Sequence, residues 1–264
     1  MKADKVVLIT GGSSGIGLAV SEYMRDAGCS VYEVSRRPSC RDAITHITGD
    51  VTVPEDMERA VQTVVERENR IDILINCAGS GISGAVEFTD AVNASSQMAV
   101  IFDGTSNACR AVLPVMRRQK SGRIVNISSV AAVVPIPFQT YYSAAKAAVN
   151  SFTLALANEV RPFNISVCAV MPGDIRTGFT SARKKITAGN EEYDGRIEKS
   201  VSRMENDEKN GMSPTAASRF IAKTALSGHV KPLYSIRFDY KLITVLAKIL
   251  PCRFMNFVIS KLYG

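Results

Sequence analysis

The sequence predicts an α/β fold in which helices cover both faces of a doubly wound parallel β-sheet. Short runs rich in Val and Ile, typical of buried parallel strands, alternate with helical stretches through the first two thirds of the 264 residues. A glycine cluster stands between the first strand and the first helix. No internal repeat or low-complexity linker divides the sequence, so we expect a single domain over residues 1–264 with an apolar helical appendage at its C-terminus.

The first strand leads into a predicted phosphate-binding turn. Lys5–Thr10 is an apolar strand pattern, Gly11–Gly17 reads Gly-Gly-Ser-Ser-Gly-Ile-Gly, and Leu18–Ala27 has a helical pattern. Glycines let the backbone approach a phosphate, and a helix N-terminus offers unpaired N–H groups. The spacing differs from the commoner fingerprint Gly-x-Gly-x-x-Gly, but its place between strand and helix favours a cofactor loop.

The second strand, Ser30–Ser35, is followed by Arg36 and Arg37, with no carboxylate immediately after it. A carboxylate near this point bonds the ribose 2′-hydroxyl of NAD, whereas an arginine accommodates the 2′-phosphate of NADP. We therefore expect NADP(H) as cofactor, held by Arg36 and then by Arg37. The alternative is that these are ordinary surface arginines.

Two further strands are expected at Thr45–Thr48 and Ile71–Ile75. Asp50 and Val51 follow the former, and the segment Asn76–Gly79 follows the latter. Parallel sheets bind ligands at the carboxyl ends of their strands, where the strand order reverses. Residues of both segments are therefore predicted to contact the cofactor.

A long helix expected over Ser95–Gln119 leads to a strand that ends at Ser129, and the next helix carries Tyr142 and Lys146. Four residues are about one helical turn, so the phenol and the ammonium share one face. A cation within about 4–6 Å lowers the pKa of a phenol, which is ordinarily ~10. Tyr142 can then exchange a proton with a carbonyl or alcohol held by Ser129, although a lone Tyr–Lys pair is more often a solvated helix face.

Residues 178–230 are expected to form a lid region over the substrate. Gly178–Gly211 is highly charged, and the alternatives are a segment that closes over substrate and excludes water, or a mobile surface loop. Residues 231–264 then supply the last strand, Leu233–Phe238, and the C-terminal helices.

Residues 241–263 have the pattern of two apolar helices broken at Pro251. Lysines and an arginine scattered among Leu, Ile, Phe and Met fit a helix that lies on a membrane interface. They fit equally a helix docked on a partner subunit or one that caps a lipophilic pocket. Packing on the protein's own body or on a subunit is the more frequent outcome.

Composition narrows the classes of function. A net charge of +7 suits anionic cofactors or a membrane surface, but without a basic-aromatic block nucleic acid is not an expected partner. Six dispersed cysteines and two histidines argue against a metal site and against disulfides, which favours a cytoplasmic protein. The N-terminus lacks the apolar run of a signal peptide, and no stretch approaches ~18 uncharged apolar residues.

Together these motifs resemble the smaller type of the short-chain dehydrogenase/reductase family, from Lys5 to about Thr177. The resemblance implies a Rossmann-like domain that interconverts alcohols and carbonyls with a nicotinamide cofactor, in a homo-oligomer such as a dimer or tetramer. The motifs in this sequence are Thr10-Gly11-x-x-x-Gly15-Ile16-Gly17, Asn76-Cys-Ala-Gly79, Ser129, Tyr142-x-x-x-Lys146 and Pro172-Gly173.

The resemblance also implies a role for each residue in a core spanning residues 1–177. Tyr142 is expected to be the acid/base, Ser129 to orient substrate, and Lys146 to bind the nicotinamide ribose and depress the pKa of the tyrosine. The predicted cofactor contacts are Gly11, Ser13, Ser14, Gly15, Ile16, Gly17, Arg36, Arg37, Asp50, Val51, Asn76, Ala78, Gly79, Tyr142, Lys146, Pro172, Gly173, Ile175 and Thr177.

One position departs from the family pattern. The family's Asn-x-x-Gly in the long helix aligns with Ile101-Phe-Asp-Gly104, and isoleucine can neither donate nor accept a hydrogen bond through its side chain. The asparagine of that motif holds a water in a proton relay to the lysine. We expect Gln97, one turn earlier, or solvent to take its place.

The glycine loop, residues 134–138 and residues 170–177 resemble the 17-beta-hydroxysteroid and retinol dehydrogenase branch. This implies NADP(H)-dependent interconversion of a secondary alcohol and a ketone on a lipophilic, steroid- or retinoid-like substrate. Two alternatives stay open: a 3-oxoacyl-thioester reductase, and a non-catalytic NADP(H)-binding sensor or scaffold.

Overall fold

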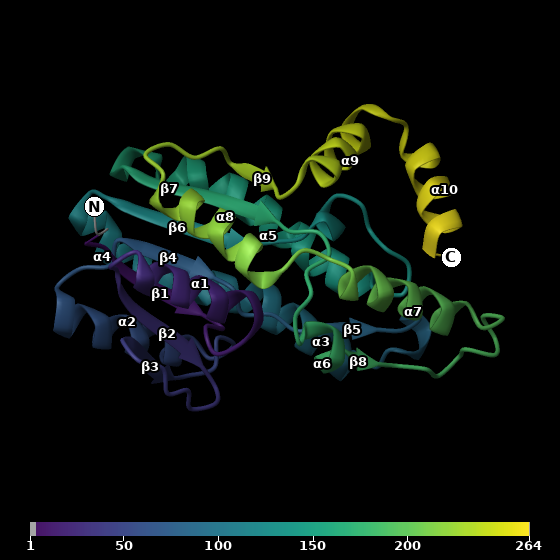
Figure 1. Cartoon of the computed structure of the whole chain (residues 1–264), viewed down its shortest axis with the longest axis horizontal. Coiled ribbons are helices and arrows are strands. Elements are labelled where there is room, and N and C mark those ends of the chain that lie inside the picture. Colours follow the sequence, from purple (N-terminus) through teal and green to yellow (C-terminus); the bar gives the residue numbers. More distant parts are fainter. Residues whose placement is uncertain (1–3, 264) are drawn as a thin grey trace.

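The structure, a computed structural model that describes residues 4–263, contains a parallel sheet of seven strands (Figure 1). Its strands are β1 (Val6–Thr10), β2 (Ser30–Ser35), β3 (Ile44–Thr48), β4 (Ile73–Asn76), β6 (Gly122–Ile127), β7 (Ile165–Met171) and β9 (Leu233–Ser235). The order across the sheet is β3-β2-β1-β4-β6-β7-β9, so the direction of winding reverses between β1 and β4. The predicted doubly wound parallel sheet is confirmed.

Helices cover both faces of this sheet. They are α1 (Gly15–Asp26), α2 (Pro54–Glu68), α4 (Gly104–Gln119), α5 (Thr140–Glu159) and α8 (Pro214–Leu226). Along β1, Val6 and Leu8 pack with α2, α4 and α5, whereas Val7 and Ile9 pack on the other face with α1 and α8. Alternate side chains thus enter two separate cores, which explains why the strands read as continuous apolar runs.

The long helix before β6 begins earlier than predicted and is not uniform. α3 (Ala91–Met98) starts at Ala91 because the carboxylate of Asp90 accepts the N–H of Asn93 at 2.7 Å, an N-terminal cap. A wider π-helical turn, Ala99–Asp103, then joins α3 to α4. This turn contains Ile101, whose side chain is buried.

The charged segment 178–211, hereafter the lid segment, has regular structure. It contains α6 (Phe179–Ala182), β8 (Lys184–Lys185) and α7 (Arg196–Lys209), and β8 pairs in parallel with β5 (Ile82–Ser83). Beyond it, α8 packs against α1 and belongs to the sheet's own helical layer. The region predicted as a lid over 178–230 therefore consists of two parts, the lid segment up to residue 211 and a second part that contains α8 of the sheet's helical layer.

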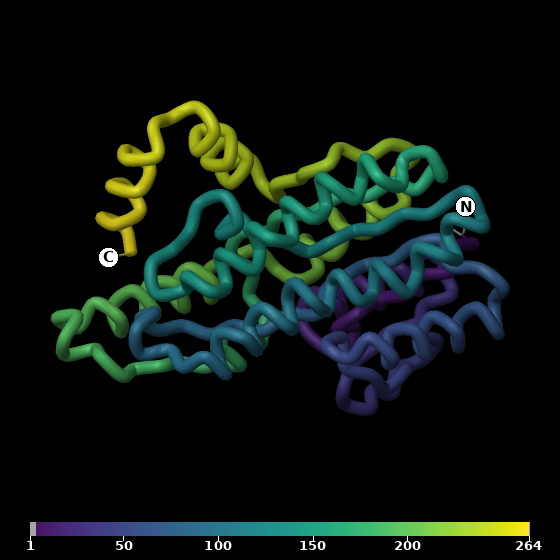
Figure 2. Tube along the Cα trace, turned by 180° about the vertical axis from the view of Figure 1, so that it is seen from behind, coloured from purple at the N-terminus to yellow at the C-terminus, as the bar shows by residue number. Residues whose placement is uncertain are grey.

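The last strand is shorter than predicted, because β9 ends at Ser235 and Phe238 begins α9. α9 (Phe238–Ile249) and α10 (Cys252–Tyr263), hereafter the C-terminal helix pair, stand beyond β9 and away from the sheet (Figures 1 and 2). Thr244 is the one buried residue of the pair in the described chain, so the expected packing on the protein's own body is largely absent. Over residues 4–263, no helix has the length and apolar character that crossing a bilayer requires.

Candidate active site

Ser129, Tyr142 and Lys146 meet at the carboxyl end of β6. Lys146 is buried in α5, its Nζ lies 5.8 Å from the centroid of the Tyr142 ring, and it donates to the carbonyl oxygen of Ile127 at 2.6 Å. Ser129 caps a short 3₁₀ turn, with its Oγ 3.1 Å from the N–H of Ala131, and it lies close enough to the phenol of Tyr142 to lower the pKa of that group. The structure therefore brings the three predicted catalytic side chains together.

The electrostatics of Tyr142 differ from the prediction. Burial raises the pKa of its phenol above the ordinary 10, while the hydrogen bond with Ser129 lowers it and the charges of Glu208 and Arg183 act in opposite directions. The expected net lowering of this pKa is wrong for the protein chain itself, because the effect of burial outweighs the groups that favour the phenolate. The phenol is consequently protonated at neutral pH and, without cofactor and substrate, is a weaker acid than a phenol in water.

Burial lowers the pKa of Lys146 to about 8, from 10.5. In the unfolded chain the amine keeps its ordinary pKa, so between pH 8 and pH 10.5 the unfolded state binds more protons than the folded state. Stability therefore rises with pH through this window. Below pH 8 the folded protein carries the full cost of a buried cation.

Lys146→Met should for this reason raise the free energy of unfolding at pH 7 by up to about 3 kcal/mol, while abolishing turnover. The gain should shrink steadily between pH 8 and pH 10.5, as the wild-type amine loses its proton in both states. Urea unfolding at several pH values measures it. A gain that does not change with pH would contradict the buried-cation account, and Lys146→Arg, which keeps the charge, should show no gain.

Ile101 and Gln97 show that the family's proton relay is absent in its usual form. Ile101 packs in an apolar cluster with Ala145, Val149 and the ring of Tyr142. Gln97 is fully buried, and its amide accepts the N–H of Ile82 and donates to the carbonyl of Ser80, both at 2.7 Å. The prediction that Gln97 substitutes for the asparagine is wrong, because its amide is committed to the chain that enters β5.

The side chain of Asn76 lies inside the sheet rather than at its edge. Its Nδ2 donates to Oδ1 of Asn126 on the next strand at 2.9 Å, and Nδ2 of Asn126 donates to Oγ1 of Thr153 on α5 at 2.8 Å. All three side chains are buried. The amide of Asn76 thus ties β4 to β6 and the catalytic helix, and any contact it makes with a cofactor has to come from its backbone.

The glycine loop after β1 has the shape that a phosphate cradle needs. Gly11 has φ +70°, and a Cβ there would lie 2.8 Å from the backbone of Ala78; a Cβ on Gly17 would lie 2.2 Å from the carbonyl oxygen of Gly11. Gly15 has φ +55° and faces open space, with Thr177 as its nearest neighbour at 3.9 Å. The loop thus leaves room at the start of α1, where a helix N-terminus attracts phosphate, and the predicted dinucleotide fits.

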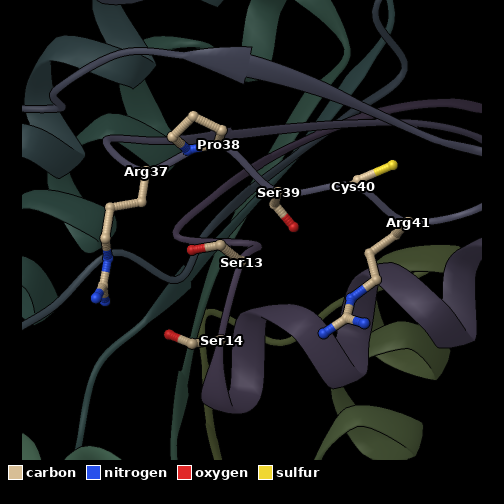
Figure 3. Close-up of a pocket in the computed structure, with 7 residues that line it drawn as sticks. All are labelled: Ser13, Ser14, Arg37, Pro38, Ser39, Cys40 and Arg41. Atoms are coloured by element: carbon tan, nitrogen blue, oxygen red, sulfur yellow. The ribbon is translucent and has the colours of Figure 1, made fainter.

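A cavity of about 410 Å³ adjoins this loop (Figure 3). It is lined by Ser13, Ser14, Arg37, Pro38, Ser39, Cys40 and Arg41. Arg37 and Arg41 approach from opposite sides, with the two loop serines between them (Figure 3). Arg36, which was predicted as the first contact, is exposed and does not line the cavity, whereas Arg41 was not predicted.

The other predicted contacts lie around the same edge of the sheet. Oδ1 of Asp50 accepts from the N–H and the hydroxyl of Thr52, and the side chain of Val51 packs against Gly104. These contacts make both residues part of the loop that joins β3 to α2. The position of this loop is therefore fixed by contacts within the protein, without a bound cofactor.

The loop after β7 is covered in an unexpected way. Pro172 accepts the N–H of Val130 through its carbonyl at 2.9 Å, and the ring of Tyr240 lies where a Cβ of Gly173 would be. The hydroxyl of Tyr240 donates to Oδ2 of Asp174 at 2.5 Å. This contact anchors α9 on the loop that carries the predicted nicotinamide contacts Ile175 and Thr177.

The lid segment supplies an aromatic and a charged wall beside Tyr142. The ring of Phe179 lies 5.9 Å from that of Tyr142, and the guanidinium of Arg183 lies 5.5 Å from Phe179. Arg183 is paired with Glu208 of α7, their side chains being 1% and 13% exposed. Nearby, an apolar cluster joins this wall to the loop before α5; its buried members are Ala85, Phe138, Ile197, Val201 and Met204.

Comparisons with known proteins agree with this geometry. A family model described as short chain dehydrogenase matches residues 5–187. The chain is 41% identical over 222 residues to a 3-ketodihydrosphingosine reductase of Bacteroides thetaiotaomicron, an alignment that covers 83% of this chain and 82% of that protein. A short-chain dehydrogenase from Streptomyces avermitilis superposes with a TM-score of 0.81 at 29% identity, covering 94% of this chain and 96% of its own. ElxO, solved with NADP bound, gives 0.75 at 25% identity, with 90% and 99% covered.

Proposed function

This chain belongs to the short-chain dehydrogenase/reductase family, and from that membership we propose that it reduces a lipophilic ketone to a secondary alcohol with NADPH. The observation that carries the proposal is the meeting of Ser129, Tyr142 and Lys146 beside the glycine loop. The reductive direction is supported by the name of the Bacteroides relative, which is a reductase.

The reaction needs a hydride at the carbonyl carbon and a proton at its oxygen. When bound, the nicotinamide supplies the hydride. Tyr142 gives its phenolic proton to the carbonyl oxygen as the C=O double bond becomes a C–O single bond, and the hydroxyl of Ser129 donates a hydrogen bond to that oxygen. The charge of Lys146 stabilises the resulting phenolate, which regains its proton from solvent.

The substrate that we propose first is a long-chain aliphatic ketone of the 3-ketodihydrosphingosine type. It is supported by the likeness to the Bacteroides reductase and by the ring of Phe179 beside Tyr142, which offers an apolar contact to an alkyl chain. Rigid steroid- or retinoid-like ketones are the second choice, since the same apolar surroundings suit them. A 3-oxoacyl-thioester is a third, because a cavity of about 330 Å³ beside Thr177 is lined by Arg176, Lys185 and Lys209.

A substrate panel tests the proposal. Purified protein is mixed with NADPH and, in turn, 3-ketodihydrosphingosine, a steroid ketone, retinal and a 3-oxoacyl-thioester, and the loss of NADPH absorbance is followed. The highest kcat/KM should belong to the sphingoid ketone. Absence of turnover with every carbonyl compound of the panel, together with intact NADPH binding, would favour the non-catalytic sensor instead.

The choice of cofactor gives a separate prediction. The double variant Arg37→Ala/Arg41→Ala should raise the KM for NADPH about tenfold or more and leave the KM for NADH nearly unchanged, because each arginine offers a charge-assisted hydrogen bond to the 2′-phosphate. Arg36→Ala should have a smaller effect, and Arg161→Ala, an exposed arginine on a distant turn, should have none. Faster turnover of the wild type with NADH than with NADPH would overturn this assignment.

A further inference from the structure

The C-terminal helix pair carries most of the exposed apolar surface of the described chain. Nine of the fourteen exposed large apolar side chains among residues 4–263 belong to it. They are Phe238, Leu242, Ile243, Val245, Leu246, Ile249, Phe254, Phe257 and Leu262. Such a concentration over two adjoining helices is unusual for a surface that meets only water.

The exposed apolar residues of α9 follow helical spacing. Phe238, Leu242, Val245 and Ile249 stand at i, i+4, i+7 and i+11, so they form one stripe along the helix, and the outermost two are 79% and 73% exposed. The opposite side of α9 holds the buried Thr244, whose hydroxyl lies 3.0 Å from that of Ser235 on β9. Thr244 therefore faces the body, whereas the apolar stripe faces outward together with the exposed Lys241 and Lys248; on an ordinary surface helix the apolar side is buried.

The charges around this surface favour one kind of partner. Residues 237–263 contain five basic residues and one acidic residue, Asp239, which is paired with Arg237. Over residues 4–263, no ion pair includes Lys241, Lys248, Arg253 or Lys261. Two copies docked face to face through this surface would bring like charges together, whereas an anionic bilayer would neutralise them and accept the apolar stripe.

We propose that the C-terminal helix pair docks the protein on the surface of an anionic lipid bilayer. Two hydrogen bonds fasten the pair to the loop after β7 and to the lid segment. Tyr240 of α9 donates to Asp174 after β7, and Tyr263 of α10 donates to Asp207 of the lid helix α7 at 3.0 Å. Docking therefore holds the lid segment near the lipid, from which a lipophilic ketone can enter.

Sedimentation with lipid vesicles tests this without substrate or cofactor, so the result is independent of the proposed reaction. The wild type should sediment with vesicles of phosphatidylcholine and phosphatidylglycerol in equal parts, and about tenfold less with phosphatidylcholine alone. Ile249→Ser/Phe257→Ser should reduce binding to the mixed vesicles about tenfold or more, because the variant loses the aliphatic side chain of Ile249 and the ring of Phe257, both of which would insert into the bilayer. Lys241→Glu/Lys248→Glu should have a similar effect, at about fivefold for each lost cation.

Val92→Ser provides the matched control, since Val92 is 79% exposed on α3, outside the pair, and its replacement should leave vesicle binding unchanged. Circular dichroism confirms that each variant is folded. Equal binding by wild type and Ile249→Ser/Phe257→Ser would overturn the proposal. So would a fall in molar mass by light scattering in that variant with no loss of vesicle binding, which would identify the surface as a contact between copies of this chain.

Discussion

Tyr142→Phe should lower kcat for ketone reduction by a factor of about 10³ or more, because the carbonyl oxygen then has no proton donor. The replacement removes one oxygen and keeps the ring, which packs between Phe179 and the cluster around Ile101. The dissociation constant for NADPH, measured by fluorescence titration, should stay nearly the same. Loss of turnover with retained cofactor binding would separate proton transfer from folding.

Tyr141→Phe is the matched control, since Tyr141 is the neighbouring residue on α5 and has no part in the proposed chemistry. Its kcat should equal that of the wild type. If Tyr142→Phe kept more than a tenth of the wild-type kcat, the phenol would not be the proton donor, and solvent or another side chain would have to replace it.

Arg183→Met should lower the free energy of unfolding by about 3 kcal/mol or more, because it leaves the largely buried carboxylate of Glu208 without its cation. Thr180 still donates to Glu208 at 2.6 Å, but a neutral donor offsets only part of the loss. Urea unfolding measures the change. The KM for a ketone should also rise, since the wall beside Phe179 and Tyr142 is loosened.

The double variant Arg183→Met/Glu208→Gln removes both charges and should recover most of the lost stability. Arg59→Met is the exposed counterpart: Arg59 pairs with Asp56 across one turn of α2, its side chain is 57% exposed, and its loss should cost less than about 1 kcal/mol. If Arg183→Met cost no more than Arg59→Met, the lid segment would not depend on its buried pair.

The sheet could be predicted because both faces of its central strands are apolar, as the alternation of Val6 and Leu8 with Val7 and Ile9 shows for β1. The meeting of Tyr142 with Lys146 followed from helical spacing alone. The pKa of Tyr142 did not, since burial is a property of the folded surroundings and its sign opposes that of a nearby cation.

Other parts of the site depend on chain reversals that carry no local pattern. Arg41 lines the cavity beside the glycine loop, and Arg183 pairs with Glu208 across twenty-five residues of the lid segment. Gln97 has the right residue type for a relay, but its amide is used by Ser80 and Ile82. The outward apolar stripe of α9 was visible as composition, yet only the fold shows which side it faces.

The buried amide bridge from Asn126 to Thr153 fixes the rotational phase of the catalytic helix. Apolar contacts can be kept when a helix shifts along its axis. A shift of α5 by one residue, however, would turn Thr153 about 100° away and leave the buried amide of Asn126 without its acceptor. The direction in which the Tyr142 side chain points is thus set by Thr153, about three turns farther along the same helix. The position of the phenol therefore depends on a buried contact that lies away from the reacting oxygen.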